Sequence, residues 1–248
     1  MTSFEVSALV LGGVLAGIIN AFAGGGSFIS FPLLMWAGLP PQVANATNRV
    51  AIVLQCATGT VNYHRHGVLP WRDLPKVVPP MILGALPGAW YASHLDEDLF
   101  RKLSALFLFL MIGTMFIDQK KWTKESPEGG RIRYWHLPGF VLLGLYGGFL
   151  QVGIGSFILG LFVLAGGYDV VRGNALKFAL AGIYNAAALA LFAKSGQVNW
   201  WAGGILASGM MIGGAIGSQL VVLRGVRWVR YVVILSALAA IIKLLTGD

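Results

Sequence analysis

Cysteine is almost absent from this sequence, since Cys56 is the only one among 248 residues. A single thiol excludes an internal disulfide, a cysteine-based zinc cluster and a haem-attachment motif. Because Cys56 lies inside an apolar run, we expect it to be a small core residue. His64 and His66 have no nearby carboxylate or cysteine that could complete a metal site, so we expect them at a membrane interface. The sequence therefore predicts no metal site and no cofactor.

Charge is also scarce, because charged residues make up 11% of the chain, hydrophobic residues make up 56% and the mean hydropathy is +0.73. A soluble domain of this length needs more surface charge, whereas a helical bundle in lipid needs charge only in its loops. We predict an all-α integral membrane protein, a polytopic helical bundle whose partner is the lipid bilayer. The net charge of +8 is assigned to cytoplasmic loops. No basic cluster is interleaved with exposed aromatics, so nucleic-acid binding is excluded.

The sequence contains no recognisable enzyme motif. Its glycine-rich stretches GGVLAG and GGGS differ from phosphate-binding loops because no lysine follows and no strand precedes them. Ser27 and Ser156 lack a histidine base in a recognisable context. We therefore expect neither an enzyme nor ATP hydrolysis, and energy for any transport would come from a coupling ion, the membrane potential or the substrate gradient.

Apolar segments recur along the whole chain, and we expect about 8–10 helical elements. We expect the first of them to stay in the mature protein, because Met1 to Val6 lacks the lysine or arginine of a cleaved signal peptide. A helix needs about 20 residues to cross about 30 Å of hydrocarbon. The segments comfortably long enough are 43–63, 74–93, 98–117, 173–193, 199–223 and 227–246, while 4–23 is a borderline case. The segments 27–38, 138–152 and 155–167 are too short, and the first of these would reach only about 18 Å.

The two halves of the chain repeat each other at a constant offset of 129 residues. The matches fall on glycine, tryptophan and asparagine over about seventy residues, which indicates a duplication. They pair Gly24 with Gly153, Gly26 with Gly155, Ser27 with Ser156, Gly38 with Gly167, Asn45 with Asn174, Gly67 with Gly196, Trp71 with Trp200, Gly84 with Gly213 and Gly88 with Gly217. We predict a first membrane repeat at 1–117, a cytoplasmic connecting loop at 118–137 and a second repeat at 138–248.

The basic loops indicate that the second repeat is inverted. Arg65 and Arg72 lie in one basic loop, which is placed inside the cell, and the acidic stretch His94 to Phe100 is placed outside. In the second repeat the loop equivalent to the acidic one carries Arg224 and Arg227, so the charge bias changes sides. Inverted repeats predict this exchange. Both termini are then expected outside.

The stretches GGGS (Gly24 to Ser27) and GIGS (Gly153 to Ser156) interrupt apolar runs and predict two facing helix breaks near the membrane midplane. Unpaired backbone is tolerated at membrane depth only where it is packed in protein or lines a polar cavity. Amide groups freed at such a break suit an anion, and we expect Ser27 and Ser156 at the N-cap positions that follow. The alternative is that these glycines only permit close helix packing, which is the reading we favour for Gly84 and Gly88.

Each repeat also places one cation just inside a helix, Arg49 in the first and Lys177 in the second. Asn45, Asn48 and Gln55 continue a polar stripe beside Arg49 at helical spacing. Neither span offers an acidic partner, so the pattern favours an anionic ligand. Alternatively, both cations extend to an interface from near a helix end.

The remaining polar candidates in this region divide into two groups. Gln151 and Asn20 precede the two breaks, and each either faces the cavity or makes an interhelical hydrogen bond. Tyr184 and Asn185 lie two to three turns beyond Asn174 on the same span.

Four features of the sequence carry a resemblance to a known family: the glycine-rich break followed by Ser-Phe, the run GLPPQVANATNR (Gly38 to Arg49), the start GGVLAGIINAFAGGG and the duplication. With them the sequence resembles the TauE/SafE family of bacterial membrane permeases. The resemblance extends over essentially the whole chain, although GNALK (Gly173 to Lys177) is less typical. It implies a multi-pass protein of the bacterial inner membrane that exports sulfite or a small organosulfonate.

We therefore expect a secondary transporter that holds a small anion between the two breaks and works by alternating access. The alternatives are an anion channel and a non-transporting membrane scaffold or assembly factor. The candidate substrate-binding residues are Gly24, Gly25, Gly26, Ser27, Asn45, Asn48, Arg49, Gln55, Gln151, Gly153, Gly155, Ser156, Asn174 and Lys177.

Overall fold

The computed structural model describes residues 1–114 and 130–224, and within these ranges the chain is helical with no strand. The predicted all-α fold is confirmed. The first half contains α1 (Ser3–Ala23), α2 (Ser27–Trp36), α3 (Pro41–Arg65), η1 (Trp71–Asp73), α4 (Leu74–His94) and α5 (Glu97–Thr114). The second half contains η3 (Tyr134–His136), α6 (Leu137–Phe149), α7 (Ile154–Gly160), η4 (Leu161–Ala165), α8 (Val170–Lys194) and α9 (Trp200–Arg224). Most of the predicted connecting loop and the predicted segment 227–246 lie outside the described residues.

The backbone reproduces the duplication seen in the sequence. Both ends of α3 are separated from the corresponding ends of α8 by the same 129 residues, and both helices contain 25 residues. The described glycines with positive φ also fall into three pairs at this offset: Gly24 with Gly153, Gly38 with Gly167 and Gly67 with Gly196. Equivalent turns of the two halves therefore use glycine for the same left-handed conformation.

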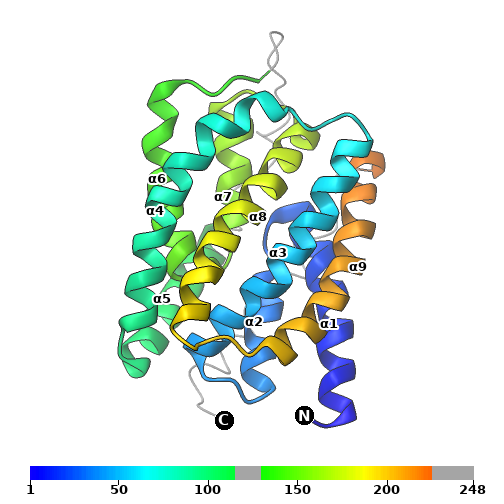
Figure 1. Cartoon of the computed structure of the whole chain (residues 1–248). Coiled ribbons are helices and arrows are strands. Elements are labelled where there is room, and N and C mark those ends of the chain that lie inside the picture. Colours follow the sequence, from blue (N-terminus) through cyan, green and yellow to red (C-terminus); the bar gives the residue numbers. More distant parts are fainter. Residues whose placement is uncertain (115–129, 225–248) are drawn as a thin grey trace.

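The second repeat runs in the opposite direction to the first. In Figure 1, α1 and α3 rise from the end that carries the N-terminus, whereas α6 and α8 descend towards it. The most extensive helix contacts join α1 to α9 and α4 to α6. In the repeat, α1 corresponds to α6 and α4 corresponds to α9. The α1–α9 contact and the α4–α6 contact are therefore equivalent, with the two repeats in exchanged roles. The equivalent helices α3 and α8 pack against each other between these pairs.

Glycine allows these helices to approach closely. A Cβ atom added to Gly84 would lie 2.7 Å from the Leu145 backbone nitrogen, and one added to Gly17 would lie 2.6 Å from the Met210 carbonyl oxygen. Such contacts are shorter than any side chain tolerates, so these surfaces require glycine. The packing role favoured for Gly84 and Gly88 agrees with this geometry.

By length and composition, three described helices could cross a membrane: Ser3–Phe22, Val170–Lys194 and Trp200–Val221. The borderline first segment therefore qualifies. The predicted spans 43–63 and 74–93 form helices of 25 and 21 residues but are less apolar. In α3 five polar side chains between Asn45 and Gln55 are buried inside the bundle, and α4 contains three internal prolines, so hydropathy alone does not identify either helix.

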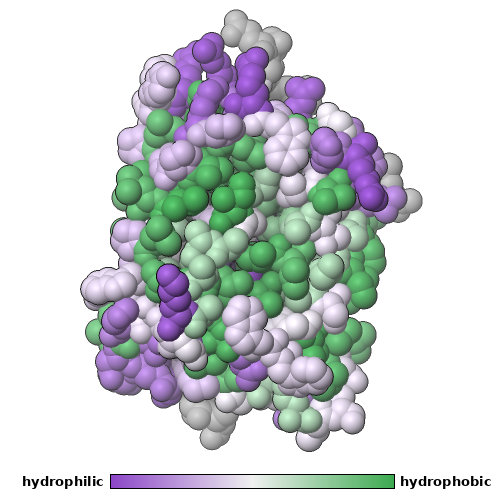
Figure 2. All heavy atoms as spheres, viewed as in Figure 1, coloured by the Kyte–Doolittle hydropathy of each residue, from purple (hydrophilic) through white to green (hydrophobic). Residues whose placement is uncertain are grey.

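The surface has the distribution expected in a bilayer. Figure 2 shows hydrophobic residues in a band between hydrophilic ends. Exposed tryptophans mark the ends of helices, where aromatic side chains favour the membrane interface. They are Trp36, Trp71, Trp90, Trp135, Trp200 and Trp201.

Candidate functional site

The two predicted breaks meet inside the bundle. α1 ends at Gly24, which has φ 70°, and α7 is preceded by Gly153, which has φ 74°. Gly24 and Gly155 approach so closely that a Cβ atom on either would lie 2.5 Å from the other's Cα. The first turn of α7 therefore packs directly on the end of α1.

The prediction that Ser27 and Ser156 are N-cap residues is wrong. Gly26 occupies the cap of α2 and Gly153 that of α7, so Ser27 is the first helical residue and Ser156 the third. The physical reason is that the left-handed turns lie at Gly24 and Gly153, and Gly26 already has helical backbone, so each helix begins before its serine could act as a cap. Ser27 is buried, and its hydroxyl accepts a hydrogen bond from Asn48 at 3.4 Å.

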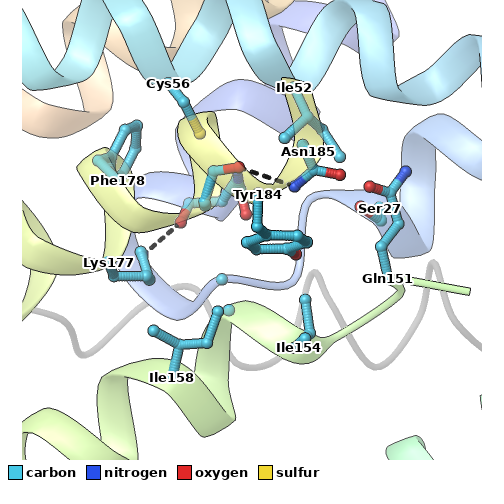
Figure 3. A pocket seen from close by; sticks show the side chains of 14 residues that line it. Ser27, Ile52, Cys56, Gln151, Ile154, Ile158, Lys177, Phe178, Tyr184 and Asn185 are labelled. Carbon is cyan, nitrogen blue, oxygen red and sulfur yellow. Dashed lines mark hydrogen bonds between the residues drawn. The ribbon is translucent and has the colours of Figure 1, made fainter. Parts of the chain in front are cut away.

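A small pocket lies beside the two breaks (Figure 3). Its walls come from both repeats, at the end of α1, the start of α2, α3, the α6–α7 break, α7 and α8. The lining residues are Asn20, Gly24, Ser27, Ile52, Cys56, Gln151, Ile154, Gly155, Ile158, Lys177, Phe178, Ala181, Tyr184 and Asn185. Its volume is about 20 Å³, on the scale of a single water molecule. A sulfite or sulfonate could enter only if the walls moved apart.

Five of the predicted site residues line this pocket: Gly24, Ser27, Gln151, Gly155 and Lys177. The other predicted residues are not part of its wall: Gly25, Gly26, Asn45, Asn48, Arg49, Gln55, Gly153, Ser156 and Asn174.

Lys177 is the charged side chain of the pocket. It is 2% exposed, and its Nζ donates to the carbonyl oxygens of Asn20 at 2.9 Å and Ala21 at 3.5 Å. These carbonyls belong to the last turn of α1, where the helix dipole favours a cation. Nζ also lies 5.0 Å from the centre of the Phe178 ring. No carboxylate is found among the lining residues that the structure describes.

Arg49 binds the end of α6, which corresponds in the second repeat to the end of α1. Its side chain is fully buried, and Nη1 donates to the Gly147 carbonyl and the Asn185 Oδ1, both at 3.0 Å. Nη2 donates to the Gly148 carbonyl at 2.6 Å. Its guanidinium also stacks 4.9 Å from the centre of the Phe192 ring. Each repeat therefore supplies one cation that binds the last turn of the other repeat's first helix.

Besides Asn48, two of the predicted amides connect helices. Asn45 donates to the Phe149 carbonyl at 2.9 Å, at the end of α6. Gln55 donates to the Gly17 carbonyl and accepts from Asn20, each at 2.9 Å.

Two further amides are buried without a hydrogen-bond partner for either side-chain atom among the described residues. They are Asn174, outside the pocket wall, and Gln151, inside it. Gln151 is 2% exposed and also has φ 60°, an uncommon backbone conformation for a residue other than glycine.

Several lining residues were not among the predicted site residues. Cys56 was interpreted as core, and the apolar wall, which includes Ile52 and Ile158, gave no functional signal. Tyr184 and Asn185 were recognised as polar residues on the same span as Asn174 but were not included among the predicted site residues, although they also lie about two turns beyond Lys177 on α8. Among the described residues, no group of three or more histidine, cysteine, aspartate or glutamate side chains could hold a metal ion.

Comparison with known proteins gives matches over nearly the whole chain. A probable membrane transporter protein, YfcA of Escherichia coli strain K12, is 30% identical over 252 residues, which cover 98% of this chain and 92% of the relative. A probable membrane transporter protein of Haemophilus influenzae is 28% identical over 228 residues, covering 91% and 88%. The sulfite exporter TauE/SafE family protein 3 of Arabidopsis thaliana is 28% identical over 156 residues, covering 59% and 32%. No solved structure gives a significant match.

The expected location in the bacterial inner membrane is consistent with these bacterial relatives. The family model described as "Sulfite exporter TauE/SafE" matches residues 9–244. The chain therefore belongs to the TauE/SafE family of membrane transporters.

Proposed function

We propose that this protein is a secondary transporter that exports a small anion, sulfite or a small organosulfonate, through the pocket at the two helix breaks. The observation that carries the proposal is the buried ammonium of Lys177 at the junction of the repeats, with no carboxylate among the described lining residues. A charge inside a membrane protein is costly unless it faces a partner or a cavity. The anion would complete that pairing. The family description and the relatives' names support transport rather than an enzymatic role.

Alternating access is supported by the exchanged helix contacts. The α1–α9 and α4–α6 pairs each join the two repeats, and the pocket lies where the repeats meet. Movement of one repeat against the other would then open the site to one side of the membrane at a time. The small size of the pocket favours a carrier over a continuous pore.

The test is anion flux in liposomes that contain the purified protein, with sulfite and isethionate as probes. Lys177→Gln is compared with Lys194→Gln, a matched change at the exposed end of the same helix. We expect saturable flux that falls at least tenfold in the pocket variant and is unchanged in the control.

Three results would contradict this proposal. Single-channel currents would indicate an anion channel. Equal flux by the wild type, Lys177→Gln and Lys194→Gln would remove Lys177 from the site. If a folded wild type moved neither probe, a scaffold role would be favoured.

A further inference from the structure

The two buried cations differ in what they can offer a ligand. Arg49 is fully buried outside the pocket wall, and its two terminal nitrogens already donate to three oxygen atoms. If the guanidinium left these acceptors to bind a ligand, the Gly147 and Gly148 carbonyls would be unpaired in the membrane interior, which is costly. Arg49 is therefore committed to the end of α6.

Lys177 keeps bonding capacity for a ligand. An ammonium has three donors, and only one of its two protein contacts is short, at 2.9 Å against 3.5 Å. It is also the only charged side chain among the described residues that line the pocket. The site thus offers one positive charge.

One positive charge compensates one negative charge. A doubly charged ligand would carry a second charge into a buried site with no counter-ion among the described lining residues, and its lost hydration would not be replaced. A singly charged ligand would leave no such excess. The single positive charge therefore favours monoanions over dianions, whatever their shape.

The rest of the wall indicates the form of the ligand. Figure 3 shows Lys177 and Gln151 at opposite ends of the pocket, with Tyr184 between them. Apolar side chains form much of the remaining wall: Ile52, Ile154, Ile158 and Phe178. The side chain of Gln151 is nine-tenths buried or more, and neither its oxygen nor its nitrogen has a hydrogen-bond partner among the described residues. An apolar stem with a polar end would use both features.

We propose that this pocket selects singly charged anions with a short apolar stem over doubly charged oxyanions, which within the proposed function favours a small organosulfonate over sulfite. The charged head binds Lys177, the stem lies against the isoleucines, and Gln151 receives a neutral polar end. The proposal rests on the proposed function, because it assumes that the transported anion occupies this pocket.

The experiment measures dissociation constants from anion-dependent thermal stabilisation of the full-length protein. Isethionate carries one charge, a short stem and a hydroxyl group, and ethanesulfonate lacks only the hydroxyl. Sulfate and sulfoacetate carry two charges. We expect both monoanions to bind at least tenfold more tightly than either dianion, with isethionate the tightest.

Two variants at one position separate charge from shape. Gln151→Lys adds a second cation and should reduce the preference for monoanions at least tenfold. Gln151→Leu adds no charge, so it should keep the preference for monoanions and remove only the advantage of isethionate over ethanesulfonate. Liposome flux of the same anions provides a second readout if either variant is unstable in detergent.

The outcomes distinguish this proposal from the one on which it rests. If sulfate or sulfoacetate binds the wild type as tightly as isethionate, selection by charge is wrong while anion transport stands. If Gln151→Lys leaves the ratio of monoanion to dianion binding unchanged, the pocket does not set it. If the folded wild type binds and moves none of the four anions, the proposed function fails as well.

Discussion

Arg49 stabilises the fold through atoms that are far from it in the sequence. Its guanidinium donates to two carbonyls at the end of α6 and to Asn185. Arg49→Gln should lower the free energy of unfolding by about 3 kcal/mol, because hydrogen bonds to a charged group contribute about 1.5–3 kcal/mol and the carbonyls would stay buried. Thermal unfolding in detergent measures the loss. Arg172→Gln, whose side chain is 56% exposed beside Asp169, is the matched control and should change stability little.

A further variant, Arg49→Lys, tests whether Arg49 binds the anion directly, as the sequence predicts. A folded Arg49→Lys protein that still shows anion-dependent stabilisation would assign Arg49 to the end of α6. Loss of that response with normal stability would instead support direct binding.

Asp73 joins the two repeats at the end of the bundle that carries η1. It is 4% exposed, and it accepts hydrogen bonds from Lys76 at 2.8 Å and from the Tyr168 hydroxyl at 2.5 Å. Burial alone would raise the pKa of Asp73, but these two bonds and the charges of Lys76 and Arg72 hold it below its ordinary value. Burial and the bond to Asp73 raise the pKa of Tyr168, so its hydroxyl remains a donor at neutral pH.

This lowered pKa predicts a pH dependence of stability. A carboxyl group whose pKa is lower in the folded than in the unfolded state stabilises the fold fully above its unfolded pKa of about 3.9 and loses that contribution as the pH falls. Tyr168→Phe should therefore cost about 1 kcal/mol at pH 7, and the difference from wild type should shrink below about pH 4. Thermal unfolding across this range measures it, with the exposed Tyr134→Phe as control. A difference that is constant with pH would contradict the linkage.

At the scale of elements, the contact between the end of α1 and the start of α7 should be sensitive to a single methyl group. Gly24→Ala combines a strained positive φ with a clash against Gly155, whereas Gly38→Ala has the strain alone, because nothing lies within 4 Å of an added Cβ. Gly38→Ala should cost about 1–2 kcal/mol. Gly24→Ala should cost clearly more, and Gly155→Ala, which has the clash without the positive φ, should also exceed Gly38→Ala. Equal melting temperatures for all three would show that the two breaks do not pack as described.

The sequence predicted elements better than their contacts. Constant spacing of glycines and asparagines predicted the repeat, and the two Gly-Ser breaks predicted the helix interruptions, because such signals depend on local backbone conformation. The partners of Arg49 could not be predicted, since carbonyl acceptors carry no residue-type signal and come within reach of the guanidinium only in the folded bundle. The apolar wall of the pocket was missed for a similar reason, because Ile52 and Ile158 look like any other lipid-facing or core residue in so hydrophobic a chain.

At the scale of the whole molecule, the two repeats are tied together by equivalent but not identical contacts. Lys177 binds the end of α1 through one short and one long hydrogen bond, whereas Arg49 binds the end of α6 through two short ones and Asn185 of α8 through a third. Only the lysine lines the pocket. An anion would therefore compete for the weaker of the two links between the repeats, which couples occupancy of the site to their relative movement.

The single cysteine of the chain provides a direct measure of that movement. Cys56 is 1% exposed and lines the pocket, so a water-soluble maleimide should react with it only when the repeats part. We expect labelling in membrane vesicles to be at least tenfold slower than at His94→Cys in a Cys56→Ser background, because His94 is exposed at the end of α4. Isethionate should change the rate at Cys56 alone. Labelling as fast at Cys56 as at the surface position would mean that the pocket is open to water at rest, as in a channel.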